Sequence, residues 1–213
     1  MRKFLTLMGF LICGILATPV ARADGVTIAA LGDSLTQGYG LPAQDGFVAQ
    51  LSMWLAVHGA EGTLINAGVS GDTTAGGAAR IGWTLTPDVD ALIVVLGGND
   101  LLRGIDPAVS RANLRTILEA ADRPVLLVGM QAPGNYGPDY KAAFDAIYPE
   151  LAAEFGALYV DSFFVGLGQG ADPAQMQHLF QSDGIHPNAE GVRLIVEGLG
   201  PHVLDLIARA EAG

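Results

Sequence analysis

The chain has 213 residues, of which 22 are acidic and 11 are basic, and its formal net charge is −11. A chain this acidic is repelled by nucleic acid and by anionic membrane surfaces, which argues against both as partners. A length of this order suits a single domain that buries a sizeable core.

Residues 1–23 differ from the rest of the chain. Two basic residues precede an almost wholly apolar run over residues 4–17, and a small-x-small sequence ends at Ala23. This is the pattern of a secretory signal peptide, and the apolar run is shorter than the roughly 20 residues of a membrane-spanning helix. We therefore predict a signal peptide followed by one exported domain over residues 24–213, without stable membrane insertion. The one cysteine, Cys13, lies in the signal peptide, so the exported domain has no disulfide bond.

Short apolar, β-branched runs alternate with stretches of helical spacing along the rest of the chain. In chain order we predict a strand at 26–31, a helix at 45–57, a strand at 63–67, a helix at 74–83, a strand at 91–96, a helix at 107–121, a strand at 125–130, a helix at 139–155, a strand at 157–161 and a helix at 189–210. This alternation predicts βαβ units with a parallel sheet covered on both faces. The expected fold class is therefore a three-layer α/β/α domain, flavodoxin-like, with five parallel strands.

Three positions carry local helix start signals. The Asp106-Pro107 and Asp172-Pro173 pairs each place an N-cap acceptor before a proline that suits the first helical position. Asn188 can cap the last helix in the same way. Within that last helix, Gly198, Gly200 and Pro201 predict a kink or a break.

Polar and glycine residues follow the predicted strands at the points where they end. Ligands of open α/β sheets bind outside the carboxyl ends of the strands, so these segments are candidates for the functional site. The candidates are Ser34 after the first strand, Gly71 after the second, Asn99 after the third, Asn135 and Tyr136 after the fourth, and Asp183 and His186 before the last helix.

Ser34, Asp183 and His186 are the residue types of nucleophilic catalysis. A serine hydroxyl needs a neighbouring base to remove its proton. A carboxylate beside a histidine fixes the tautomer of the ring and stabilises the imidazolium. Asp183 and His186 are three residues apart, with Gly184 between them allowing a tight turn. The alternative is a loop aspartate that caps the next turn beside a solvent-exposed histidine.

Acyl transfer also needs donors directed at the developing oxyanion. Ser34 and Gly71 each offer a backbone N–H, and Asn99 offers a side-chain amide. The alternative is that Gly71 only turns the chain and that Asn99 only ends a strand.

Four stretches in this order resemble the four sequence blocks of the SGNH (GDSL) hydrolases. They are LGDSLTQGYG, AGVSGDTTAGG, LGGND and DGIHPN, and together they run from residue 31 to residue 188. The stretches LLRG, APGNYG and AFDAIYPELAAEFG also resemble the bacterial multifunctional thioesterase/lysophospholipase/arylesterase subgroup. The subgroup is similar in having a signal peptide and a periplasmic location, so the resemblance implies the periplasm, with full secretion left open.

The resemblance implies a role for each candidate. Ser34 would be the nucleophile, and His186 would be the general base and acid, oriented by Asp183. The oxyanion hole would consist of the N–H of Ser34, the N–H of Gly71 and the side chain of Asn99. Asp33 is expected to shape the turn through its own hydrogen bonds. The walls of the substrate site would include Leu101, Ile105, Asn135 and Tyr136.

The implied activity is that of a serine esterase. It would hydrolyse carboxylic esters through an acyl-enzyme, with thioesters and lysophospholipids as further candidate substrates and with no metal or cofactor. We expect a monomer. The subgroup often has a smaller residue where this chain has Leu101, which bears on the preference for acyl chain length rather than on the chemistry.

Two other functions are compatible with parts of the sequence. An esterase that removes acetyl groups from carbohydrates would have the same four blocks and different site walls. A non-catalytic flavodoxin-like module for a flavin or nucleotide would have the same sheet. The Gly-rich GDTTAGG lacks the Gly-Lys-Ser/Thr of a phosphate-binding loop, which argues against the second of these.

Overall fold

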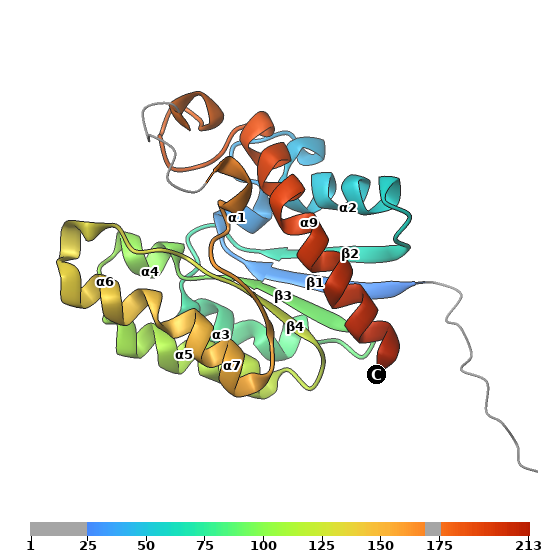
Figure 1. The fold of residues 1–213 in the computed structure, drawn as a ribbon, viewed down its shortest axis with the longest axis horizontal. Coiled ribbons are helices and arrows are strands. Elements are labelled where there is room, and N and C mark those ends of the chain that lie inside the picture. Colours follow the sequence, from blue (N-terminus) through green and yellow to red (C-terminus); the bar gives the residue numbers. More distant parts are fainter. Residues whose placement is uncertain (1–24, 169–175) are drawn as a thin grey trace, which may run out of the picture.

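The structure, a computed structural model, describes residues 25–168 and 176–213, so the predicted signal peptide over residues 1–23 lies outside the described residues. Five parallel strands form one sheet in the order β2-β1-β3-β4-β5 (Figure 1). The strands are β1 (Val26–Gly32), β2 (Gly62–Gly68), β3 (Ala91–Val95), β4 (Val125–Val128) and β5 (Leu158–Val160). This strand order is the flavodoxin-like one, so the predicted fold class is confirmed.

Helices cover both faces of the sheet. One face carries α2 (Phe47–Val57) and α9 (Ala189–Ala212), and the other carries α3 (Thr74–Thr84), α5 (Pro107–Ala120), α6 (Pro138–Asp145) and α7 (Ile147–Phe155) (Figure 1). The single helix predicted over 139–155 is therefore wrong in one respect, because a turn at Ala146 divides it into α6 and α7. Two helices of a single turn or slightly more, α1 (Ser34–Gln37) and α4 (Gly98–Leu102), follow β1 and β3.

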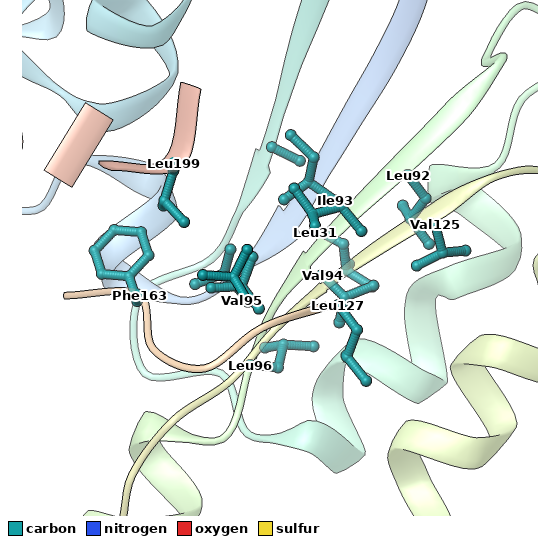
Figure 2. Packing of buried hydrophobic residues seen from close by; sticks show 14 of the residues in the cluster. Leu31, Leu92, Ile93, Val94, Val95, Leu96, Val125, Leu127, Phe163 and Leu199 are labelled. Atoms are coloured by element: carbon teal, nitrogen blue, oxygen red, sulfur yellow. The ribbon is translucent and has the colours of Figure 1, made fainter. Parts of the chain in front are cut away.

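The core lies on both sides of the central strands. Every residue of β3 and β4 is buried, as is nearly every residue of β1. Figure 2 shows Leu31, Val94 and Leu127 of these strands with Phe163 and Leu199 from segments that follow later in the chain. Strands buried on both faces have continuous apolar sequences, which is why these three were identifiable as short apolar runs.

The helix starts predicted at Asp106 and Asn188 are confirmed, and the one predicted at Asp172-Pro173 lies outside the described residues. The Asp106 side chain accepts a hydrogen bond from the N–H of Ala108 at 2.8 Å, with Pro107 in the first turn of α5. The Asn188 side chain accepts one from the N–H of Gly191 at 3.0 Å and caps α9.

We predicted a kink or a break around Gly198, Gly200 and Pro201, and the break is wrong, because α9 continues through Pro201 without interruption. The buried face of α9 packs along the sheet, and this tertiary packing outweighs the local preference of proline and glycine to end a helix. Gly198 instead serves a close approach. A Cβ atom at this position would lie 2.6 Å from the backbone nitrogen of Gly166 in η3 (Val165–Leu167).

None of the helices within residues 25–168 and 176–213 combines the length and the apolar character that a membrane-spanning helix requires.

Alanine substitutions at two helical glycines, Gly198 and Gly82, should have opposite effects on stability. Gly198→Ala places a methyl group against a backbone atom and should lower the free energy of unfolding by about 1–3 kcal/mol. Gly82 in α3 has open space where its Cβ would lie, so Gly82→Ala should raise it by up to about 1 kcal/mol through helix propensity. Urea unfolding of the two variants measures both effects, and equal effects would contradict the packing described here.

Candidate active site

The loops that follow the strands surround one cavity at the carboxyl edge of the sheet. Its volume is about 930 Å³. Ser34, Gly71, Asn99 and His186 all line it, although they come from four separate segments of the chain. The structure thus brings together the candidate nucleophile, the candidate base and the candidate oxyanion donors.

Ser34 begins the one-turn helix α1 directly after β1. The side chain of Asp33 caps this helix by accepting a hydrogen bond from the N–H of Leu35 at 3.0 Å. Gly32 allows α1 to pack tightly on the strand end, since a Cβ there would lie 1.9 Å from Thr36 Oγ1. No non-glycine residue in the described part of the chain has a positive φ, so Ser34 is held without strained backbone.

His186 joins Ser34 to Asp183 through its two ring nitrogens. The distance from His186 Nε2 to Ser34 Oγ is 2.9 Å, across 152 residues of sequence. The distance from His186 Nδ1 to Asp183 Oδ2 is 2.7 Å. The other carboxylate oxygen of Asp183 accepts the N–H groups of Ile185 and His186 at 2.9 and 3.0 Å. The spacing of three residues therefore produces a direct contact.

Hydrogen bonds set the charge state of Asp183. The bond from the His186 side chain, followed by those from the two backbone N–H groups, lowers the pKa of this carboxyl to about 2. The carboxylate therefore stays ionised near neutral pH. An ionised carboxylate accepts a hydrogen bond from Nδ1–H, which keeps the proton on Nδ1 and leaves Nε2 free to accept the proton of Ser34.

The two further oxyanion candidates are each held by a side chain. Gly71 has a φ of +82° in the loop after β2, and its carbonyl oxygen accepts a hydrogen bond from Arg103 Nη2 at 2.8 Å. Asn99 lies in the first turn of α4, and its Nδ2 donates to Asp33 Oδ2 at 3.2 Å.

One guanidinium group connects the segment that precedes Ser34 to the loop that carries Gly71. Arg80 of α3 donates to the carbonyl oxygens of Gly32 and Ala67 at 2.8 and 2.7 Å, at the ends of β1 and β2. It also forms an ion pair of 2.7 Å with Asp72, the residue after Gly71. Arg80 was not predicted from the sequence, because an arginine in an amphipathic helix gives no signal of such a contact.

A buried carboxylate also anchors the segment that carries Asn99. Asp100 is fully buried and accepts hydrogen bonds from the N–H of Thr74 at 2.9 Å and from Ser110 Oγ at 2.8 Å. These bonds join α4 to the starts of α3 and α5. The LGGND sequence contained this residue, but sequence alone did not separate its role from that of its neighbour.

Three of the four predicted wall residues, Leu101, Asn135 and Tyr136, line the cavity. Ile105 is not among the lining residues, and its carbonyl oxygen accepts a hydrogen bond from the Tyr140 hydroxyl at 2.9 Å. An apolar wall formed by Phe164, Val165, Leu167, Met176 and Phe180 also lines the cavity and was not predicted from the sequence. Tyr39, whose ring centroid lies 4.7 Å from that of His186, was not predicted either.

The cavity, the Ser–His–Asp contact and the flavodoxin-like sheet together define a serine hydrolase site. Residues 30–194 match the model of the GDSL-like Lipase/Acylhydrolase family. The chain therefore belongs to this family, and it is an enzyme that hydrolyses esters.

Relatives with similar sequences agree with this assignment. Esterase TesA of Pseudomonas aeruginosa is 37% identical over 92% of this chain and 96% of its own length. Thioesterase 1/protease 1/lysophospholipase L1 of Escherichia coli is 35% identical over 93% of this chain and 92% of its own length. Among solved structures, AlinE4, an SGNH-hydrolase family esterase, is 42% identical with a TM-score of 0.70, covering 87% of this chain and 98% of its own. These relatives favour the esterase over the non-catalytic binding module.

Asp33 is a buried carboxylate next to the candidate nucleophile. Only 1% of its surface is exposed. Burial is the largest influence and raises the pKa of Asp33 to about 6, against the lowering effects of its hydrogen bonds from Leu35 and Asn99. Because the folded pKa lies above the unfolded one, folding binds a proton between about pH 4 and pH 6. This group therefore lowers stability as pH rises through that range.

The pH dependence of unfolding should report this buried charge. Relative to Asp33→Asn, which does not titrate, the native protein should lose about 2 kcal/mol of unfolding free energy between pH 4 and pH 7. Urea unfolding of both proteins, followed by circular dichroism across this range, measures the difference. A difference that stays constant with pH would contradict the raised pKa.

Proposed function

We propose that the chain hydrolyses carboxylic esters through an acyl-enzyme on Ser34, with His186 as general base and acid and Asp183 orienting the histidine. The observation that carries this proposal is the distance of 2.9 Å between His186 Nε2 and Ser34 Oγ, in a ring that Asp183 holds through Nδ1. This is the geometry that an activated serine requires.

The proposed reaction has two halves. In the first, Ser34 Oγ attacks the ester carbonyl carbon while its proton passes to His186 Nε2. The bond to the alcohol oxygen then breaks, and the imidazolium returns the proton to that oxygen. In the second half, His186 takes a proton from water, and the hydroxide attacks the acyl-serine. Collapse of this second intermediate releases the acid and returns the proton to Ser34 Oγ.

In both halves a negative charge develops on the carbonyl oxygen. We assign its stabilisation to the N–H of Ser34, the N–H of Gly71 and the Nδ2 of Asn99. The position of all three residues around one cavity supports this assignment. Donors that are fixed before the reaction stabilise such a charge most effectively. The bond from Arg103 to Gly71 and the bond from Asn99 to Asp33 support such fixation.

The proposed substrates are esters with a single apolar acyl chain, including thioesters and lysophospholipids. Their acyl chain would lie between Leu101 and the apolar wall that contains Phe164, Leu167 and Phe180, all of which line the cavity. Apolar acyl groups gain free energy by leaving water for such a surface. The names of the relatives, which include esterase, thioesterase and lysophospholipase, are consistent with these substrates.

We also propose that the protein acts as an exported monomer, in the periplasm, after cleavage of a signal peptide at Ala23. The apolar run that follows two basic residues supports export. A site whose candidate residues all come from one chain supports the monomer.

Removing the nucleophile should abolish activity. Ser34→Ala should reduce the hydrolysis of p-nitrophenyl butyrate to the background rate, because no other hydroxyl contacts His186 Nε2 in the described part of the chain. Circular dichroism should show a folded protein. Near-native turnover by the folded variant would refute the assignment.

Removing one oxyanion donor should be almost as damaging. Asn99→Ala should lower kcat by about 100- to 1000-fold with a small change in KM, because the bond to the oxyanion forms mainly in the transition state. Steady-state kinetics on the same ester measures both constants. A loss of less than tenfold would remove Asn99 from the oxyanion hole.

A panel of substrates separates the apolar-ester proposal from carbohydrate deacetylation. We expect kcat/KM to rise from p-nitrophenyl acetate to p-nitrophenyl hexanoate, since about 0.8 kcal/mol is gained for each buried CH₂. Phe164→Ser should reduce this rise. Faster hydrolysis of acetylated xylan than of any p-nitrophenyl ester would favour the deacetylase.

A further inference from the structure

We propose that Asp33 is a positioning residue for Asn99: its carboxylate holds the Asn99 amide so that Nδ2, rather than Oδ1, faces the reacting carbonyl. The inference rests on the proposed function, because it takes Asn99 as an oxyanion donor. It goes beyond that function, because it gives Asp33 a part in catalysis without contact to the substrate.

The two oxygens of Asp33 have different partners. Oδ1 accepts the N–H of Leu35 at 3.0 Å and so caps the helix that begins with Ser34. Oδ2 accepts Asn99 Nδ2 at 3.2 Å, across 66 residues of sequence. Since β1 and β3 are neighbours in the sheet, the residues that follow them lie side by side. One carboxylate therefore links the nucleophile helix to the oxyanion amide.

The chemistry of the amide makes this link directional. The two ends of an asparagine side chain have nearly the same shape but opposite hydrogen-bonding character. An ionised carboxylate only accepts hydrogen bonds, so a rotated Asn99 would place Oδ1 against Asp33 Oδ2, with two acceptors in contact. In the observed orientation Nδ2 uses one hydrogen for Asp33 and keeps the other for a second acceptor. A developing oxyanion in the cavity is such an acceptor.

Capping alone does not explain a carboxylate at this position. Serine and asparagine cap helices as well as aspartate does, and neither introduces a buried charge. The charge at Asp33 is disfavoured by burial and by Asp100, and it is favoured by His186 and by the two hydrogen bonds. A carboxylate provides two acceptors on one rigid group, and the structure uses both.

The substitution Asp33→Asn separates the two roles. The new amide can keep its oxygen toward Leu35 and so preserve the cap, but it then presents an NH₂ group to Asn99. Asn99 should rotate to accept from that group, which turns its own oxygen toward the oxyanion. We expect kcat on p-nitrophenyl butyrate to fall by about 100- to 1000-fold, as for loss of the donor itself, and KM to change by less than about threefold.

A double-mutant cycle tests whether Asp33 acts through Asn99. If it does, Asp33→Asn combined with Asn99→Ala should be no more than about threefold slower than Asn99→Ala alone. At pH 7 the Asp33→Asn protein should be at least as stable as the native protein, because it lacks the buried charge. A lower kcat in a protein that is not less stable distinguishes positioning from a structural role.

Two further variants serve as a matched control and as a second test of the role of Asp33. Asp106→Asn makes the same change at the cap of α5. Within the described residues the Asp106 side chain accepts a hydrogen bond only from the N–H of Ala108, so kcat and KM should stay within about twofold. Asp33→Ser keeps a capping oxygen and lacks the second acceptor, so it should lose activity as Asp33→Asn does. It serves as the test if Asp33→Asn does not fold.

The outcomes are distinct. If both Asp33 variants fold and keep kcat within threefold of native while Asn99→Ala loses 100-fold or more, Asp33 is only a cap and the inference is wrong. Losses that multiply in the double variant would also overturn it, because the two residues would then act independently. If Asn99→Ala itself loses less than tenfold, the oxyanion assignment fails first and the inference fails with it.

Discussion

The parallel sheet brings His186 and Ser34 into contact, because it places the segments that carry them at the same edge. Ser34 follows the first strand, and His186 lies in the loop before the last helix, yet Nε2 and Oγ are 2.9 Å apart. Parallel strands place all their carboxyl ends at one edge, so residues distant in sequence meet there. The fully buried strands β3 and β4 and the nearly buried β1 give that edge a rigid support. The precision of the site therefore originates in the packing of the core.

Three buried or half-buried polar groups then fix the positions of the loops around the cavity. Arg80 binds carbonyl oxygens at the ends of β1 and β2, and Asp100 joins α4 to the starts of α3 and α5. Asp33 is the third such group, between the segments of Ser34 and Asn99. Polar groups inside a protein interact strongly when satisfied and are costly when unpaired, so each of them restricts the backbone around the cavity to one arrangement. Ester hydrolysis by fixed donors requires that restriction.

Features that depend on neighbouring residues could be predicted from the sequence, whereas features that depend on contacts between distant segments could not. Strands such as Ala91–Val95 were predictable because burial on both faces requires a continuous apolar run. The helix caps at Asp106 and Asn188 were predictable because a cap involves only residues close in sequence. The break in α9 was predicted wrongly, since the packing that keeps the helix intact involves distant segments. The contacts of Arg80 and the apolar wall around Phe164 could not be predicted for the same reason, because they also depend on segments that meet only in the tertiary fold.

Labelling of the nucleophile tests most directly whether Ser34 forms the covalent acyl intermediate that we propose. A fluorophosphonate reacts with an activated serine hydroxyl, and the product is stable enough for mass spectrometry of the digested protein. We expect one adduct per chain, on the peptide that contains Ser34, and a greatly slowed reaction in a folded His186→Ala variant. An adduct on another residue, or complete inhibition without any adduct at Ser34, would contradict this proposal.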